Sequence, residues 1–153
     1  MTGLAGNGLI TLNWAPVIGA AGYNLWRSTN NGASYQEIAT NLAATSYVDA
    51  TAVAGQTNSY EVAAANGSGA SLNSGPVGIF LPAPQLSAVN SGANTITLAW
   101  PVWANAWTLA YATNLLPPIL WYPVTNAIGS NNGQFNVTLP AAAAQSYFRL
   151  TAP

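Results

Sequence analysis

Apolar and polar residues alternate in short runs along most of this chain. The runs are rich in Val, Ile, Thr, Tyr and Trp, and turn-forming stretches such as Asn30-Asn31-Gly32 and Asn132-Gly133 separate them. Alternation with a period of two is typical of strands that bury one face, and no stretch carries the sustained apolar stripe of a helix. The pattern therefore predicts an all-β protein, and short strands at regular spacing favour β-sandwiches.

The alternation also gives the bounds of the expected strands. In the first half of the chain they cover Leu9–Trp14, Gly22–Ser28, Tyr35–Ala39, Ser46–Asp49, Ser59–Asn66 and Gly75–Leu81. In the second half they cover Gln85–Val89, Thr95–Trp100, Trp107–Thr113, Leu120–Val124, Gly133–Leu139 and Ser146–Leu150. Asn and Gly accept the positive φ of tight turns, so hairpin turns are expected at the Asn-Gly steps.

Two parts of the chain repeat one arrangement. The segment "ITLNW" recurs as "ITLAW", and each copy is followed at a similar distance by Ser-Tyr. Such a repeat predicts two tandem β-sandwich domains, at residues 2–81 and 85–153, with a stiff Pro-rich hinge at residues 82–84. The large aromatic residues at matching positions are expected to be core anchors: Trp14, Tyr60, Trp100 and Tyr147.

The first domain resembles the fibronectin type III family over Leu4–Leu81. The resemblance rests on "GLITLNWAPVIGAAGYNLWRSTNNGASYQEIAT", "TSYVDATA" and "NSYEVAAANGSGAS", which place the family's B-strand Trp at Trp14 and its F-strand Tyr at Tyr60. The loop before Tyr60 is longer than is usual in the family, which leaves the partner of the Tyr60 hydroxyl open.

The second domain is similar to the degenerate Ig-like β-sandwich at the C-terminus of many large secreted bacterial proteins. The similarity is carried by Thr113-Asn114-Leu115, Trp121–Asn126 and the final Phe148–Leu150. The two resemblances together imply an extracellular, non-catalytic bacterial module of the kind that often stands beside enzymes or adhesins.

Charge is scarce, and this excludes several classes of partner. Charged residues make up 3% of the chain, against about 25% in typical domains, and they are Arg27, Glu37, Asp49, Glu61 and Arg149. With so few cations, nucleic acid and anionic membrane surfaces are not expected partners. A polar surface with little net charge tolerates self-association.

Other sequence features argue against cofactors and membrane insertion. The chain has no Cys and no His, so thiol chemistry and structural zinc are not expected, and we expect no cofactor. No apolar run is long enough to span a membrane, and the first residues lack the features of a signal peptide. The family resemblances imply an extracellular or cell-surface protein, and we expect that its signal peptide is absent from this sequence.

Catalysis is not expected, because the acidic residues are few. Glycoside hydrolysis would need two carboxylates facing one cleft, and Glu37 and Glu61 are the pair available for it. An ordinary cross-strand ion pair between Glu61 and Arg27 is the simpler interpretation. Asp49 alone offers too few oxygen atoms for calcium.

The tryptophans are the clearest functional signal. Trp26 lies on the opposite side of its strand from Tyr23 and Leu25, so its side chain is expected to face outward. The side chain of Trp107 is expected to face inward. A candidate exposed platform, for sugar rings or a protein partner, consists of Trp26, Trp103, Trp121 and Tyr122.

The ends of the two domains predict open sheet edges. After Tyr60 the first domain continues through a last strand to Leu81, but few residues follow Tyr147, so the second domain is expected to lack its last strand. The opening strand of the first domain is expected to be clipped or absent. Unpaired edges accept further strands, and the candidate assembly residues are Thr2, Leu4, Leu9, Arg149, Leu150 and Pro153.

These observations lead to two hypotheses of function. The first is a non-catalytic extracellular structural protein that assembles with itself, head to tail, into a filament or surface matrix. The alternative is a carbohydrate-binding or adhesion module, such as a fragment of a larger secreted protein, with a polysaccharide as its partner.

Overall fold

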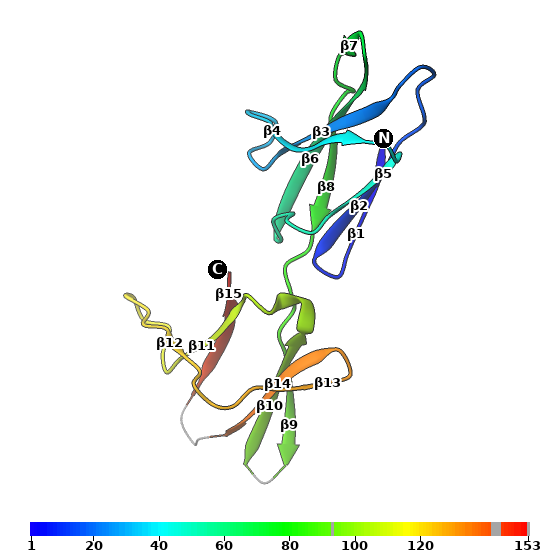
Figure 1. Cartoon of the computed structure of the whole chain (residues 1–153). Helices are drawn as coiled ribbons and strands as arrows, with labels where there is room; N and C mark the ends of the chain where they lie inside the picture. Colours follow the sequence, from blue (N-terminus) through cyan, green and yellow to red (C-terminus); the bar gives the residue numbers. More distant parts are fainter. Residues whose placement is uncertain (93, 142–144, 153) are drawn as a thin grey trace. The chain divides into compact units, whose positions relative to one another are not determined.

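The chain divides into two compact β-sheet units, Met1–Ala83 and Pro84–Pro153 (Figure 1). The computed structural model describes residues 1–92, 94–141 and 145–152. Each unit contains two antiparallel sheets. The prediction of an all-β fold with β-sandwich units is confirmed.

In the first unit, strands from distant parts of the chain are neighbours in each sheet. One sheet has the order β1-β2-β5, formed by β1 (Thr2–Gly6), β2 (Leu9–Asn13) and β5 (Ser46–Asp49). The other has the order β4-β3-β6, formed by β4 (Gln36–Leu42), β3 (Gly22–Ser28) and β6 (Gln56–Asn66). The free side of β6 pairs with β7 (Gly69–Ala70) and β8 (Val77–Leu81).

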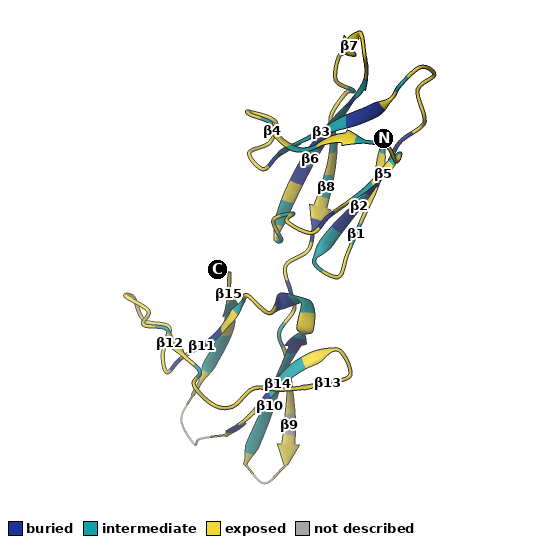
Figure 2. Ribbon diagram, in the orientation of Figure 1, coloured by how far each residue is buried: buried dark blue, intermediate teal, exposed yellow. Residues whose placement is uncertain are grey.

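The core of the first unit follows the alternation of its strands. In β2, Ile10 and Leu12 are fully buried, whereas Asn13 is exposed. Trp14 packs edge-on against Tyr23, with ring centroids 5.6 Å apart. The buried core consists of Ile10, Leu12, Trp14, Tyr23, Leu25, Tyr60 and Leu81 (Figure 2). Trp14 and Tyr60 are thus the core anchors that the sequence predicts.

The expectation that the first unit lacks its opening strand is wrong. β1 pairs with β2 along its whole length, from Thr2 opposite Asn13 to Gly6 opposite Leu9. Asn7 and Gly8 join the two strands, with φ of 52° and 78°, as a two-residue hairpin turn requires. Leu9 therefore lies in a strand between β1 and β5, and not at a sheet edge.

The second unit repeats the two-sheet arrangement with fewer strands. One sheet has the order β13-β14-β10-β9, formed by β13 (Gly129–Asn131), β14 (Gln134–Pro140), β10 (Thr95–Pro101) and β9 (Ser87–Gly92). The other has the order β12-β11-β15, formed by β12 (Tyr122–Pro123), β11 (Thr108–Ala112) and β15 (Tyr147–Thr151). A 3₁₀ turn, η1 (Val102–Ala104), follows β10. The buried core consists of Leu98, Trp100, Ala104, Leu109, Val137 and Leu139.

Tyr147 is not a core anchor, which corrects the prediction made from the repeat. Phe148 and Leu150 pack against the core of the second unit, and they pair with Tyr111 and Leu109 of β11. Neighbouring residues in a strand point to opposite faces, so Tyr147 points away from the core. Its hydroxyl donates to Gln145 Oε1 at 3.1 Å. The buried position in β15 is therefore one residue later than the repeated Ser-Tyr indicates.

β15 is an edge strand, as the missing-strand prediction requires. In the first unit, β6 pairs with β3 on one side and with β8 on the other. Among the residues of the second unit that the structure describes, β15 pairs with β11 alone. Within these described residues, β15 has no neighbour in the place that β8 takes beside β6.

The placement of Phe148 and Tyr147 gives the first prediction. Phe148→Ala should lower the free energy of unfolding of the second unit by about 3 kcal/mol, because it leaves a cavity beside the core. Tyr147→Ala should cost about 1 kcal/mol or less, because its ring points away from the core. Urea unfolding of the full chain measures the loss of stability in each variant. Amide exchange in β11 shows which unfolding transition belongs to the second unit. Equal losses would contradict the assignment.

Candidate functional site

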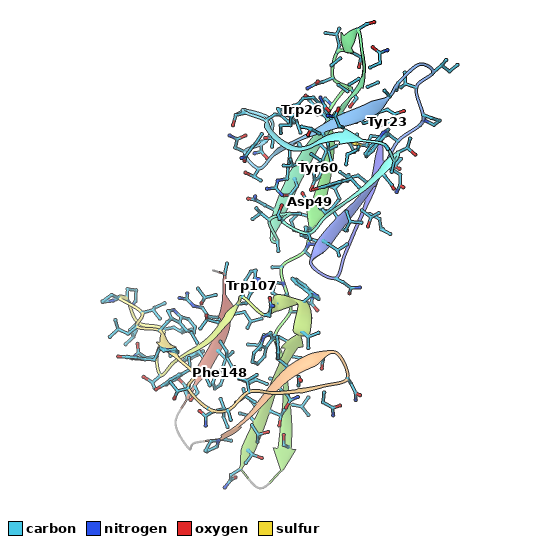
Figure 3. The ribbon with its side chains drawn as sticks, viewed as in Figure 1. Tyr23, Trp26, Asp49, Tyr60, Trp107 and Phe148 are labelled. Carbon is cyan, nitrogen blue, oxygen red and sulfur yellow. The ribbon has the colours of Figure 1, made fainter. Side chains whose placement is uncertain are left out.

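β3 places different chemistry on its two faces. Tyr23 and Leu25 are buried in the core, and Arg27 lies on the same side of the strand. Trp26 and Asn24 lie on the opposite, outer side, as the alternation predicts. Trp26 on β3, and Asp49 and Tyr60 in the same unit, are labelled in Figure 3.

On the inner side, the carboxylate of Asp49 is the centre of a polar network. Arg27 Nη1 and the Tyr60 hydroxyl each donate to Asp49 Oδ2 at 2.8 Å. The backbone N–H and the hydroxyl of Thr51 donate to Asp49 Oδ1 at 2.9 and 2.8 Å. The side chain of Asp49 is 1% exposed and that of Arg27 14% exposed, so this ion pair is shielded from water.

The network joins the two sheets of the first unit. Asp49 is the last residue of β5, whereas Arg27 and Tyr60 belong to β3 and β6 of the other sheet. Asp49 is therefore the partner of the Tyr60 hydroxyl that the sequence leaves open. The expected ion pair between Arg27 and Glu61 is wrong, because Arg27 lies opposite Tyr60 in the register and its guanidinium binds Asp49.

The contacts of Asp49 shift two pKa values in opposite directions. Burial by itself raises the pKa of Asp49, but the hydrogen bonds from Arg27, Thr51 and Tyr60 outweigh it and hold the pKa below its ordinary value. Burial, together with the hydrogen bond to Asp49 and the charge of Asp49, raises the pKa of Tyr60. The Tyr60 hydroxyl therefore keeps its proton and remains a donor at neutral pH.

On the outer side, Trp26 lies between two carboxylates. In the register it is opposite Glu37 of β4 and opposite Glu61 of β6. Directly opposite residues have Cβ atoms about 5 Å apart, so both acidic side chains border the Trp26 side chain. We call Glu37, Trp26 and Glu61 the outer row. Sequence reasoning missed this row because it depends on the pairing register of three strands.

The groups of the outer row differ in their contacts. Glu61 Oε2 accepts a hydrogen bond of 2.9 Å from Asn73 Nδ2, whereas Glu37 is exposed and has no partner in the described part of the chain. Trp26 faces outward, as the sequence predicts, and is half-buried. The indole N–H groups of Trp14 and Trp100 are buried without a hydrogen-bond partner, whereas that of Trp26 is not buried in this way.

The pKa of the Tyr35 phenol is raised, first by burial and then by the charge of Glu61.

The outer row places an indole ring between its two carboxylates. Glu37 and Glu61 lie on strands separated by β3, so their backbones are about 10 Å apart, and the Trp26 side chain lies between them. The substrate bond of a glycosidase would need that space. Among the described residues, no group of three or more His, Cys, Asp or Glu side chains is placed to hold a metal ion.

The other predicted platform residues lie in the second unit and do not gather with Trp26. Trp103 is half-buried and packs against the core, as does Trp107. Trp121 is half-buried, with the guanidinium of Arg149 4.2 Å from the centre of its ring. Tyr122 is 47% exposed, and its ring lies 5.8 Å from that of Tyr111. Trp103 and Trp121 are thus not the freely exposed rings that the sequence predicts.

The predicted assembly residues also have different environments. Thr2 and Leu4 belong to the edge strand β1, and the neighbouring Gly3 is close to the Ile79 side chain of β8. Leu150 packs against the core of the second unit, so it does not project from the edge of β15. Pro153 lies outside the described residues. Over the described ranges, no helix is long and apolar enough to cross a membrane.

Comparison with known proteins places the fold in a family. No protein-family model matches the chain. An Fn3-like protein of Clostridium thermocellum is 31% identical, with a TM-score of 0.49, and the match covers 54% of this chain and 88% of that protein. The chain belongs to the fibronectin type III family. The resemblance predicted from the sequence is thereby confirmed.

More distant fibronectin type III proteins match nearly the whole chain. A two-domain fibronectin type III segment of chicken tenascin is 16% identical, with a TM-score of 0.44, and the match covers 94% of this chain and 81% of that segment. The chicken interferon gamma receptor alpha chain is 14% identical, with a TM-score of 0.48, and the match covers 96% and 87% of the two chains.

Among curated relatives, part of the chain matches amylopullulanases. It is 38% identical over 60 residues to the enzyme of Thermoanaerobacterium thermosulfurigenes and 37% identical over 60 residues to that of Thermoanaerobacterium saccharolyticum. Each match covers 39% of this chain. The chain spans only 3% and 5% of the length of these two enzymes.

The lowered pKa of Asp49 gives the second prediction. The ordinary value is 3.8, so the stability that ionised Asp49 gives to the fibronectin type III unit is complete above about pH 4 and is lost as the pH falls through the lower, folded-state pKa. Asp49→Asn should lower the free energy of unfolding by about 3 kcal/mol at pH 7, because it leaves Arg27 without its partner. In this variant the free energy of unfolding should also fall less steeply at acidic pH.

Urea unfolding between pH 2 and 7, followed by amide exchange in β3, tests this prediction. Glu37→Gln removes an exposed carboxylate from the same unit and is the matched control. The prediction would be contradicted if the free energy of unfolding of Asp49→Asn fell as steeply at acidic pH as that of the unchanged protein.

Proposed function

We propose that this chain is a non-catalytic accessory module of a larger extracellular bacterial protein that acts on polysaccharide. The observation that carries the proposal is the 38% identity to a 60-residue segment of an amylopullulanase, an enzyme whose name refers to starch-type glucans and pullulan. A segment that fills 3% of such an enzyme can belong to a part outside its catalytic centre. The assignment to the fibronectin type III family supports the same role.

The positions of the acidic residues support a role without catalysis. Asp49 is buried, and its oxygens accept hydrogen bonds from Arg27, Thr51 and Tyr60. The two remaining carboxylates border Trp26 on a sheet face and do not face each other across a cleft. A neutral surface with few charges also suits a module that has to work close to a neutral polymer.

The third prediction tests the non-catalytic role. Incubation of the 153-residue chain with soluble starch and with pullulan should release no reducing ends above the protein-free blank. The double variant Glu37→Gln, Glu61→Gln is the control for a contaminating hydrolase, because trace hydrolysis by a contaminant survives the substitutions. Hydrolysis that the two substitutions abolish would contradict the proposal.

Self-assembly through β15 is a second candidate function. The observation that favours it is that β15 pairs with β11 alone among the described residues, in a chain with 3% charged residues, since charge is one means by which proteins protect exposed edges. Pairing of β15 with β15 of a second copy is isologous and closes as a dimer, whereas a filament needs a second complementary surface. The presence of β1 removes the clipped edge that the head-to-tail hypothesis assigned to the first unit.

The fourth prediction concerns this edge. If β15 pairs between copies, light scattering should show a mass that rises from 15.7 kDa towards twice that value with concentration. Amide exchange should slow at Tyr147–Thr151 over the same range, while exchange at Thr2–Gly6 serves as the internal control. A constant monomer mass would contradict assembly and leave the accessory role in place.

A further inference from the structure

We propose that the outer row of the first unit binds a neutral glucan chain. Trp26 stacks against a sugar ring, and Glu37 and Glu61 accept hydrogen bonds from the hydroxyl groups of that ring and its neighbours. The choice of glucan rests on the proposed accessory role, while the site itself rests on the placement of these three side chains.

The register places the three side chains on one face of the sheet, next to an irregularity in the β3–β4 pairing between Leu25 and Trp26. β4, β3 and β6 are neighbours, and Trp26 pairs with Glu37 on one side and with Glu61 on the other. A ring bordered in this way offers an apolar surface about the size of one sugar, with an acceptor at each side. Sites for small ligands commonly combine an aromatic surface with a few placed polar groups.

Each group of the row has a part that is free for a ligand. Only one oxygen of Glu61, Oε2, accepts the hydrogen bond from Asn73, which orients the carboxylate and leaves the other oxygen for a ligand. Glu37 is exposed without a partner among the described residues. The indole N–H of Trp26 is neither buried nor paired within the same part of the chain.

The combination of donors and acceptors favours hydroxyl groups as the ligand chemistry. A hydroxyl both donates and accepts, so a sugar can donate to Glu37 or Glu61 and accept from the Trp26 indole or the Asn73 amide. Hydrogen bonds to an ionised carboxylate are stronger than those between neutral groups. A cationic side chain pairs with the carboxylates and stacks on the indole face, but it accepts no hydrogen bond and so leaves the indole N–H unused.

The charges of the unit leave the outer carboxylates available. Arg27 lies on the other side of β3, where its guanidinium is 2.8 Å from Asp49, so it does not neutralise Glu37 or Glu61. The remaining cationic side chain, Arg149, belongs to the second unit and stacks on Trp121. Neither guanidinium therefore pairs with Glu37 or Glu61, and the hydrogen bond from Asn73 occupies only one oxygen of Glu61.

The fifth prediction is made with the full chain and with maltoheptaose and pullulan as probes, measured by calorimetry and affinity electrophoresis. Trp26→Ala should weaken binding by about tenfold or more, because it removes the stacking surface. Trp26→Phe should retain part of the affinity. Glu37→Gln and Glu61→Gln should each weaken binding by roughly two- to tenfold, since an amide oxygen is a weaker acceptor than a carboxylate.

Tyr122→Ala and Trp121→Ala test the rival platform residues that the sequence predicts in the second unit, and both should bind as the unchanged chain does if the outer row alone is the site. Urea unfolding of every variant shows whether the first unit remains folded, and Trp26→Phe keeps the test valid if Trp26→Ala does not fold.

Three results would overturn the site: binding that survives in folded Trp26 variants, binding that is lost in Tyr122→Ala, or binding of a polylysine peptide in place of both glucans. None of these results bears on the non-catalytic role, which the starch and pullulan assay decides separately.

Discussion

The ion pair between Asp49 and Arg27, together with the Tyr60 hydroxyl, is the constraint on which the first unit depends. A carboxylate that is 1% exposed is stable only if its charge is paired and its oxygens are hydrogen-bonded, because the cost of removing a charge from water is otherwise several kcal/mol. Those partners come from β3 and β6, while Asp49 ends β5 in the opposite sheet. The network therefore specifies which residues of three strands face inward. A shift of β3 by one residue would bring Trp26 to the buried face and remove Arg27 from Asp49.

The outer face of the sheet is a consequence of this inner constraint. Since Arg27 is held opposite Tyr60, the next pair in the register is Trp26 opposite Glu61. The second unit has no comparable buried charge among its described residues, and its single charged residue, Arg149, stacks on Trp121 at the surface. There Phe148 and Leu150, which pack against the core, mark the inward face of β15. The two units thus use different means to select the buried face of their F-strand equivalents, β6 and β15.

Much of the fold could be predicted from the sequence wherever the signal is local. β3 and β5 have the predicted bounds, because clear alternation and flanking turn residues define both. β1 was missed because "TGLAG" contains two Gly and no β-branched residue apart from Thr2, although Asn7-Gly8 is a hairpin signal. Tyr147 was misplaced because the repeated Ser-Tyr step is offset by one residue from the buried position. The partner of Tyr60 and the outer row depend on register and on contacts between sheets, which no local pattern contains.

The distribution of the acidic residues separates the groups that the fold requires from those that it does not. Asp49 is needed for stability, since it satisfies two buried donors from the other sheet. Glu37 and Glu61 satisfy no buried group, and two like charges on one face repel each other weakly at about 10 Å across solvent. Folding would lose little if both were neutral. In a chain with 3% charged residues, two carboxylates on either side of one tryptophan are therefore not explained by what holds the sandwich together, and this is the ground for the proposed glucan site.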